Sequence, residues 1–212
     1  MLKKNNFFQK FPFQKKSFNN NLRKTRKAFE SLKIDLNNFE IPMMESYEKN
    51  YNLGFSQQTI KRFSKYKNII IIGMGGSISG TKSIYSFFKK KIKKKLFFFD
   101  SLDTTLHLEF KKIKNLKNSC FIIVSKSGNT IETIVNLGII YPKIKEGKKI
   151  IFITGMKDSN LASLANNFNA EVIEHKPFIG GRYSVMSEVS MFPAALMGLK
   201  INKFKNLNKL IK

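Results

Sequence analysis

From residue 68 onward the sequence alternates between short apolar runs and segments of helical periodicity, and this alternation limits the folds open to the chain. Strands that are buried on both faces have continuous apolar sequences of this kind. The runs are residues 68–73 (NIIIIG), 95–100, 120–124, 148–154 and 170–175. Because a helical segment separates each run from the next, the sequence predicts right-handed βαβ units. We therefore expect an α/β fold, a three-layer αβα sandwich with a five-stranded parallel sheet of flavodoxin-like type.

The segments between the apolar runs predict the helices. They cover residues 77–90, 103–116, 129–144 with an end near Pro142, 158–168 with Asp158 or Ser159 as cap, and 183–197. Upstream, Leu22, Phe29 and Leu32 lie near helical spacing, and Ser56 is a predicted N-cap. We expect a basic N-terminal arm and helix in residues 1–45, one α/β domain in residues 46–200, and a basic tail in residues 201–212.

The formal net charge of +25 raises the question of a nucleic-acid partner. Lysine, asparagine, isoleucine and phenylalanine are all abundant, and A- and T-rich codons produce this composition. Nucleic-acid readers use arginine forks or aromatic platforms, and neither forms an organised motif here. We expect no specific nucleic-acid partner, and a charge-driven binder of nucleic acid or anionic surfaces stays open as a rival.

The few cysteines and histidines limit which kinds of covalent cross-link and metal site the chain can have. Cys120 is the single cysteine, so the chain has no internal disulfide. The histidines, His107 and His175, belong to no cluster of metal ligands, and we expect neither a metal nor a cofactor. No signal peptide is recognisable, and no run approaches the roughly 18 apolar residues of a membrane span. We expect no membrane partner and a cytoplasmic location.

A glycine-rich loop, GMGGSISG over residues 73–80, follows the first apolar run. In open α/β sheets, ligands bind outside the carboxyl ends of the strands. The glycines allow close approach of the backbone, and Ser77 opens a helix whose amide groups can bind an anion. The spacing fits neither the dinucleotide fingerprint nor the P-loop.

The loop SKSGNT, residues 125–130, follows the third run and has the groups that hold a compact anion. Ser125, Ser127 and Thr130 offer hydroxyl groups, Lys126 offers a cation, and a helix predicted from Asn129 adds its amides. These groups fit a phosphate monoester. The alternative is that the hydroxyls only cap a helix, but capping needs one hydroxyl and the loop has three.

The third candidate segment is FIGGRYS, residues 178–184. Gly180 and Gly181 let the chain approach another group closely, and Arg182 is predicted at the start of a helix. A cation there opposes the helix dipole, which suggests contact with a negative ligand. The alternative is a surface arginine paired with Glu188 or another acid.

Together the motifs IIGMGGSISG, VSKSGNTIET and GGRYSVMSEVSMFPAAL resemble the glucose-6-phosphate isomerase family over about residues 40–200. The second motif is also typical of the wider sugar-isomerase (SIS) domain family. The resemblance implies that Arg182 stabilises an enediolate intermediate and that Gly76 and Gly181 line the sugar. The implied phosphate ligands are Ser77, Ser125, Lys126, Ser127 and Thr130. Family members often have threonine in place of Ser127, and the hydroxyl is kept.

The implied reaction interconverts glucose 6-phosphate and fructose 6-phosphate through a cis-enediol, in glycolysis and gluconeogenesis. Family members carry the glutamate base, a histidine and a lysine in a second SIS domain, and these motifs are not found here. We therefore expect the N-terminal half of such an enzyme, inactive by itself. The alternative is a non-catalytic SIS phosphosugar sensor.

By the same resemblance we expect a homodimer. The candidate residues for an apolar contact surface are Met186, Met191 and Phe192, with core packing as the alternative reading of the same three side chains.

Overall fold

The structure is a computed structural model that describes residues 15–38, 40–144, 147–155 and 158–207. Its contacts divide the chain into two units, residues 1–44 and residues 45–212. In the first unit, helix α1 (Lys15–Asn37) contains no buried residue. The helix predicted for this segment is therefore present, and its apolar side chains are not part of a buried core.

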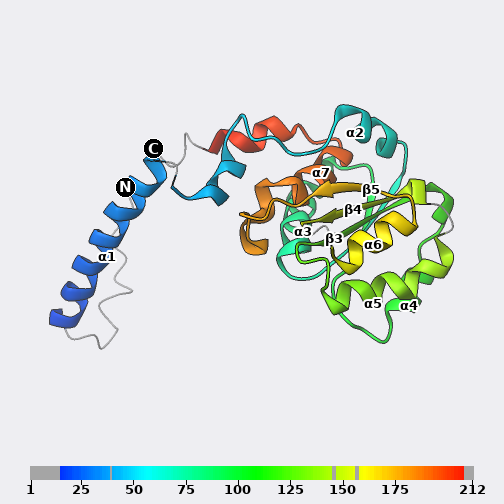
Figure 1. The fold of residues 1–212 in the computed structure, drawn as a ribbon, viewed down its shortest axis with the longest axis horizontal. Coiled ribbons are helices and arrows are strands. Elements are labelled where there is room, and N and C mark those ends of the chain that lie inside the picture. The colour runs from blue at the N-terminus through cyan, green and yellow to red at the C-terminus, as the bar shows by residue number, and fades with distance from the viewer. Residues whose placement is uncertain (1–14, 39, 145–146, 156–157, 208–212) are drawn as a thin grey trace. The chain divides into compact units, whose positions relative to one another are not determined.

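Within the described residues, the second unit contains a five-stranded sheet in which every pair of neighbours is parallel (Figure 1). The order is β2-β1-β3-β4-β5, so the direction of strand addition reverses between β1 and β3. This confirms the predicted α/β sandwich. The strands are β1 (Asn68–Gly73), β2 (Lys95–Phe99), β3 (Ser119–Ser125), β4 (Ile150–Thr154) and β5 (Glu171–Glu174).

Helices cover both faces of the sheet, and each face has its own apolar core. Along β1, Ile69 and Ile71 belong to one core, and Ile70 and Ile72 belong to the other. This alternation explains why the sequence of β1 is apolar from Ile69 to Ile72 without interruption. The first face carries α2 (Gln57–Ser64), α3 (Gly76–Phe88) and α7 (Glu188–Leu196), and the second carries α4 (Leu106–Lys111), α5 (Ile131–Ile140) and α6 (Asn160–Asn167).

Short 3-10 helices connect these elements and extend the domain to residue 207. Phe204 lies in the last of them and packs against the first core, in the segment that the sequence assigns to a tail. The described 3-10 helices are η2 (Pro42–Tyr47), η3 (Lys89–Lys91), η4 (Leu116–Asn118), η5 (Tyr141–Lys143), η6 (Gly147–Lys149), η7 (Gly181–Met186) and η8 (Ile201–Leu207).

Several predicted helices are shorter than the sequence pattern suggested, and the reason is clear for two of them. The segment 103–116 is α-helical only over α4, because the Asp103 carboxylate accepts the Thr105 backbone and hydroxyl protons in a turn. The segment 183–197 divides at Ser187, which is extended and whose hydroxyl accepts the Val189 N–H as the cap of α7.

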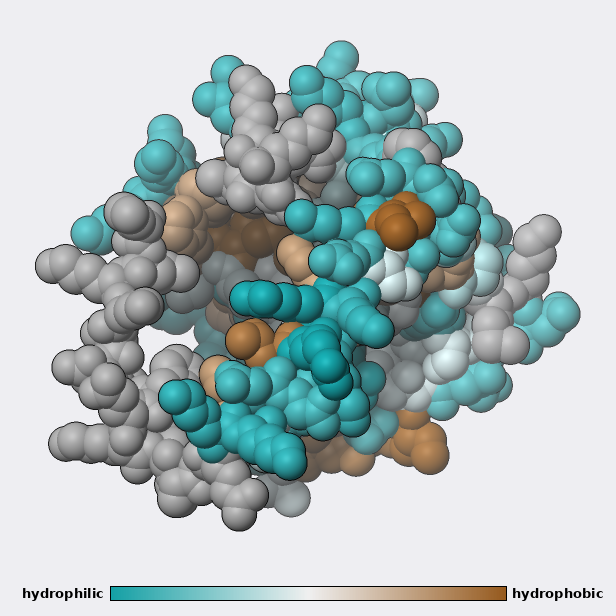
Figure 2. All heavy atoms as spheres, turned by 90° about the vertical axis from the view of Figure 1, so that its left-hand side faces the viewer, coloured by the Kyte–Doolittle hydropathy of each residue, from teal (hydrophilic) through white to brown (hydrophobic). Residues whose placement is uncertain are grey.

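Other features of the sequence have the structural roles expected of them. Ser56 caps α2 and Ser159 caps α6, each through its hydroxyl. Met186, Met191 and Phe192 are buried, so core packing is the correct reading of these three side chains. On the face seen in Figure 2, hydrophilic residues predominate and hydrophobic ones form small separate groups. No helix in the described ranges is both long and apolar enough to cross a membrane.

Candidate functional site

The loops after β1 and β3 meet at the point where the strand order reverses. Gly73, the last residue of β1, pairs with Val124 of β3. A side chain on Gly73 would lie 3.0 Å from the Val124 carbonyl oxygen and 3.4 Å from the Ser77 Cβ. Ser77 therefore lies over the ends of both strands, which is where ligands of this fold class bind.

Three hydroxyl groups from the loop after β3 lie together at this end of the sheet. The Ser125 and Thr130 hydroxyl oxygens are 2.8 Å apart, and the Ser127 hydroxyl oxygen lies 3.4 Å from Thr130 and 3.5 Å from Ser125. Ser125 is buried, Thr130 is half-buried and Ser127 is exposed. The cluster therefore opens from the sheet towards solvent, as a binding site for a small anion requires.

Backbone amides fix the orientation of two of these hydroxyls. The Gly128 N–H donates to the Ser125 hydroxyl oxygen at 3.2 Å, and the Asn129 N–H donates to the Ser127 hydroxyl oxygen at 3.2 Å. A serine that accepts an amide proton keeps its own O–H for donation to another acceptor. Gly128 has φ +67°, and α5 begins at Ile131 rather than near Asn129, so the predicted start was two residues early.

Lys126 makes a contact that the sequence did not suggest. Its ammonium donates to the Pro177 carbonyl oxygen at 2.6 Å, and its carbonyl accepts the Gly155 N–H at 3.0 Å. The charge is therefore engaged outside the hydroxyl cluster. The lysine joins the loop after β3 to the segment that leads to Gly181 and Arg182.

The glycine loop after β1 contacts the segment at residues 181–184 directly. A side chain on Gly76 would meet the Gly181 carbonyl and would lie 2.9 Å from the Arg182 backbone nitrogen. The Ser184 hydroxyl, which the sequence analysis did not single out, lies 2.7 Å from the Gly181 carbonyl oxygen and 3.3 Å from that of Gly76. The structure thus brings together Gly76, Gly181 and the start of Arg182.

Arg182 lies in η7 rather than at the start of an α-helix, so the helix-dipole argument for it does not apply. Its side chain is exposed and makes no ion pair with any acid that the structure describes. The alternative pairing with Glu188 is not formed. Glu188 is buried, accepts the Tyr51 hydroxyl at 2.9 Å and accepts the Lys176 N–H at 3.2 Å.

Two buried ionisable groups flank the segment that carries Arg182. Burial raises the pKa of the Glu188 carboxyl above its usual value. His175 is fully buried, burial lowers its pKa, and the nearby Lys126 charge adds to that effect. Across the residues described, no group of three or more His, Cys, Asp or Glu is arranged to hold a metal ion.

The chain resembles known proteins over most of this second unit. A profile of the phosphoglucose isomerase family matches residues 41–212. The glucose-6-phosphate isomerase of Methanocaldococcus jannaschii is 32% identical over 182 residues, which are 81% of this chain and 44% of that protein. The glucose-6-phosphate isomerase of Borreliella afzelii is 37% identical over 143 residues, 62% of this chain and 27% of that protein.

Solved structures agree on the fold. A glucose-6-phosphate isomerase from Chlamydia trachomatis superposes with a TM-score of 0.61 at 23% identity, over 70% of this chain and 29% of that chain. The sugar isomerase domain of an RpiR transcription factor from Sphaerobacter thermophilus gives 0.50 at 13% identity, over 85% and 97%. The chain spans less than half the length of the Methanocaldococcus jannaschii and Borreliella afzelii enzymes. With its profile match covering both loops of the site and the Gly181–Arg182 segment, the chain belongs to the phosphoglucose isomerase family.

Proposed function

We propose that the chain supplies the phosphate site and the enediolate-stabilising arginine of a glucose-6-phosphate isomerase, which interconverts glucose 6-phosphate and fructose 6-phosphate through a cis-enediol. The observation that carries the proposal is the cluster of Ser125, Ser127 and Thr130 hydroxyls at the strand-order reversal. Two of the three also accept backbone amides and keep an O–H to donate, and a phosphate oxygen would compete for these protons with the contact between Ser125 and Thr130.

The sugar extends from this cluster towards the paired glycines in the proposed arrangement. Ser77 would add a hydroxyl to the phosphate, Gly76 and Gly181 would line the sugar, and the Lys126 ammonium would tie the two loops together. The exposed and unpaired Arg182 guanidinium is free to stabilise the negative oxygen of the enediolate. The base that moves the proton between the first two carbons comes from a second SIS domain, as in the rest of the family.

The proposal includes a domain division and a location. Residues 1–45 are an arm and helix, residues 46–200 are the SIS domain, and residues 201–212 are a basic C-terminal segment whose Phe204 packs against the first core of that domain. We also propose a cytoplasmic protein that needs no cofactor.

A non-catalytic phosphosugar sensor is the second candidate function. The likeness to the RpiR sugar isomerase domain supports it. Arg182 argues against it, because a sensor needs the phosphate and hydroxyl contacts but has no enediolate to stabilise.

A homodimer is part of the proposal, and the outer face of α5 supports it. Ile131 is 69% exposed, and Val135 and Ile139 are each 42% exposed. These residues are four apart, so they form one apolar stripe along the helix. A helix that is apolar on its outer face as well as its inner face is usually covered by another protein surface.

Calorimetric titration with fructose 6-phosphate tests the phosphate site, with fructose and inorganic phosphate as the two partial ligands. We expect saturable binding that Ser125→Ala abolishes. Ser83→Ala is the matched control, because Ser83 is exposed on α3 and donates only to the Ser79 carbonyl one turn earlier. Loss of binding in both variants, or in neither, would contradict the assignment of the loop after β3.

Arg182→Ala separates the isomerase from the sensor. Under the isomerase proposal, this variant binds fructose 6-phosphate within about threefold of the parent, because Arg182 acts mainly on the transition state. It loses the isomerase activity that the parent chain shows when the second half of the Methanocaldococcus relative is added. If the parent binds the phosphosugar but gives no activity with that half, the sensor is favoured.

A further inference from the structure

A pocket at the opposite end of the sheet from the hydroxyl cluster is lined mainly by lysines. Its volume is about 500 Å³, and no acid is among its described lining residues. The segments that enter β1, β2 and β3 contribute Lys65, Lys67, Lys93, Lys94, Lys95 and Lys114. We refer to these six residues as the lysine pocket. Since β1 has six residues, about 20 Å of strand lies between this pocket and the candidate phosphosugar site.

The backbone around the lysine pocket is fixed by hydrogen bonds between its walls. The Asn68 side-chain amide donates to the Lys114 carbonyl at 3.2 Å, and the Lys67 N–H donates to the Asn118 carbonyl at 3.1 Å. The Lys95 N–H donates to the Lys67 carbonyl at 3.1 Å. Three lysines on three different segments are therefore anchored to one another before any ligand binds.

One of the six ammonium groups is used by the protein itself. Lys94 donates to the Ser64 carbonyl at 2.6 Å and to the Tyr66 carbonyl at 2.8 Å, and burial lowers its pKa. The other five lysine side chains are exposed, and none pairs with an acid in the described part of the chain. The pocket therefore concentrates positive charge without a counter-charge.

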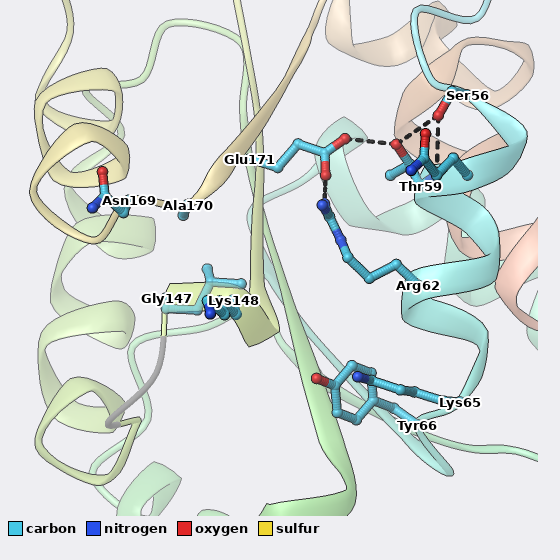
Figure 3. Close-up of a pocket in the computed structure, with 12 residues that line it drawn as sticks. Ser56, Thr59, Arg62, Lys65, Tyr66, Gly147, Lys148, Asn169, Ala170 and Glu171 are labelled. Atoms are coloured by element: carbon cyan, nitrogen blue, oxygen red, sulfur yellow. Dashed lines mark hydrogen bonds and ion pairs between the residues drawn. The ribbon is translucent and has the colours of Figure 1, made fainter.

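A neighbouring pocket shows the opposite arrangement (Figure 3). Lys65 and Tyr66 line both pockets, and the volume of this second pocket is about 760 Å³. There the Arg62 guanidinium points at the Glu171 carboxylate and pairs with it, and Thr59 donates to the same carboxylate at 2.7 Å. In this neighbouring pocket an acid neutralises the arginine charge, whereas in the lysine pocket no acid lies beside the lysine charges among the described lining residues.

We propose that the lysine pocket binds a linear polyphosphate anion, either inorganic or as the phosphate chain of a nucleoside triphosphate. Consecutive phosphates carry several negative charges within a few ångströms, and five ammonium groups without an acidic partner in the described part of the chain can neutralise them, although one of these, that of Lys65, lies over the Tyr66 ring at 5.3 Å. Lysine ammonium groups are flexible point charges, so they suit an anion without a single fixed geometry. A single phosphate monoester would leave most of these charges without a partner.

Single-stranded nucleic acid fits the pocket less well. Such strands are bound by stacking their bases on exposed aromatic side chains, with help from arginine. Tyr66 is the aromatic residue that lines the lysine pocket, and it is only 7% exposed. The pocket therefore offers charge for phosphates but no surface for bases.

Titration calorimetry with sodium tripolyphosphate at about 0.15 M salt, where exposed charges more than about 8 Å apart are screened, tests the proposal. Parallel titrations use orthophosphate, ATP and a ten-nucleotide oligouridylate. We expect one tripolyphosphate site per chain, weaker binding of orthophosphate, and no competition from saturating fructose 6-phosphate. The orthophosphate and ATP titrations tell whether consecutive phosphates are needed and whether a nucleoside is tolerated.

Charge-reversal variants locate the site. The triple variant Lys67→Glu/Lys93→Glu/Lys95→Glu should lose about tenfold or more in affinity for tripolyphosphate. Each exposed ion pair raises the affinity by a factor of about 1.5 to 5, and charge reversal both removes that attraction and adds a repulsion of similar size. The control Lys24→Glu/Lys27→Glu/Lys33→Glu changes the net charge equally at three lysines that do not line the pocket, and it should retain affinity within about twofold. The same three pocket lysines changed to glutamine serve as a second variant if the glutamate variant does not fold.

Three results would overturn the proposal. Equal losses in the pocket and α1 variants would mean that only the overall charge matters. Loss of tripolyphosphate binding in Ser125→Ala would place the ligand at the hydroxyl cluster. Tighter binding of the oligouridylate than of tripolyphosphate would identify a nucleic-acid surface instead.

Discussion

Gly128 and Gly138 stand ten residues apart, and the same substitution should have opposite effects on them. Gly128 has φ +67°, and an added Cβ would lie 2.5 Å from the Ser159 Cβ and 2.9 Å from the Thr154 hydroxyl oxygen. Gly138 is in α5, and an added Cβ would meet nothing within 4 Å. Gly128→Ala should therefore destabilise the fold, and Gly138→Ala should stabilise it.

The magnitudes follow from the two environments. In Gly128→Ala, the left-handed backbone costs about 1 kcal/mol for a residue with a Cβ, and displacing Ser159 from its role as the cap of α6 costs about 1 kcal/mol. Overpacking against Thr154 adds about 1 kcal/mol or more. Together these lower the free energy of unfolding by about 3 kcal/mol, which for a chain of this size is a drop of roughly 6–12 °C in Tm. Gly138→Ala should raise it by about 0.5–1 kcal/mol, because alanine is the better helix former.

Urea denaturation followed by circular dichroism measures both free energies. The chain has no tryptophan, so helical signal is a better probe than fluorescence. Fructose 6-phosphate binding should be weakened in Gly128→Ala and unchanged in Gly138→Ala, because only the first distorts the loop that carries Ser125 and Ser127. The reasoning is refuted if the two variants differ by less than about 1 kcal/mol, since the difference expected from the terms above is about 3.5–4 kcal/mol.

The buried ionisable groups give three further predictions. His175 has a lowered pKa, so its contribution to stability is present above its unfolded value of 6.5 and is lost as the pH falls below it; the urea midpoint of the parent should fall more between pH 7.5 and 5.5 than that of His175→Gln, and parallel falls would contradict this. Glu188 has a raised pKa, so its contribution to stability is greatest below its unfolded value of 4.5 and declines as the pH rises. The free energy of unfolding of the parent minus that of Glu188→Gln should therefore be higher at pH 4.5 than at pH 7, and a value that rises with pH would exclude this. Burial raises the pKa of Cys120 to about 12, so a thiol reagent at pH 8 should label the folded protein only at its unfolding rate, and immediate labelling would show that the thiol is accessible.

The three inner strands β1, β3 and β4 could be predicted from the sequence because every residue in them is buried and most are apolar. Each run from Ile69 to Ile72 and from Cys120 to Val124 is apolar at every position, and each ends at a glycine or a hydroxyl residue. The helix bounds were less predictable. A 3-10 helix followed by a capped α-helix has nearly the same apolar spacing as one long helix, so the break at Ser187 was missed although its side chain is a common cap.

The contacts of the site that cross between loops could not be read from the sequence. Lys126 reaches Pro177 across 51 residues, and Ser184 reaches Gly76 across 108 residues. A sequence pattern shows that Lys126 has a charge but not which carbonyl the charge will face. The positions of the hydroxyls in the loop after β3 were predictable because all three belong to one turn of six residues.

The 108 residues between Gly76 and Ser184 also set when the site can form during synthesis of the chain. At roughly 5–20 residues per second, the ribosome adds Ser184 about 5–20 s after Gly76. Until then the glycine loop lacks the partner segment at residues 181–184, even if β1 and β3 have already paired. A phosphosugar that needs both parts can therefore bind only a nascent chain whose last helices have emerged, and its binding would report that the domain is complete.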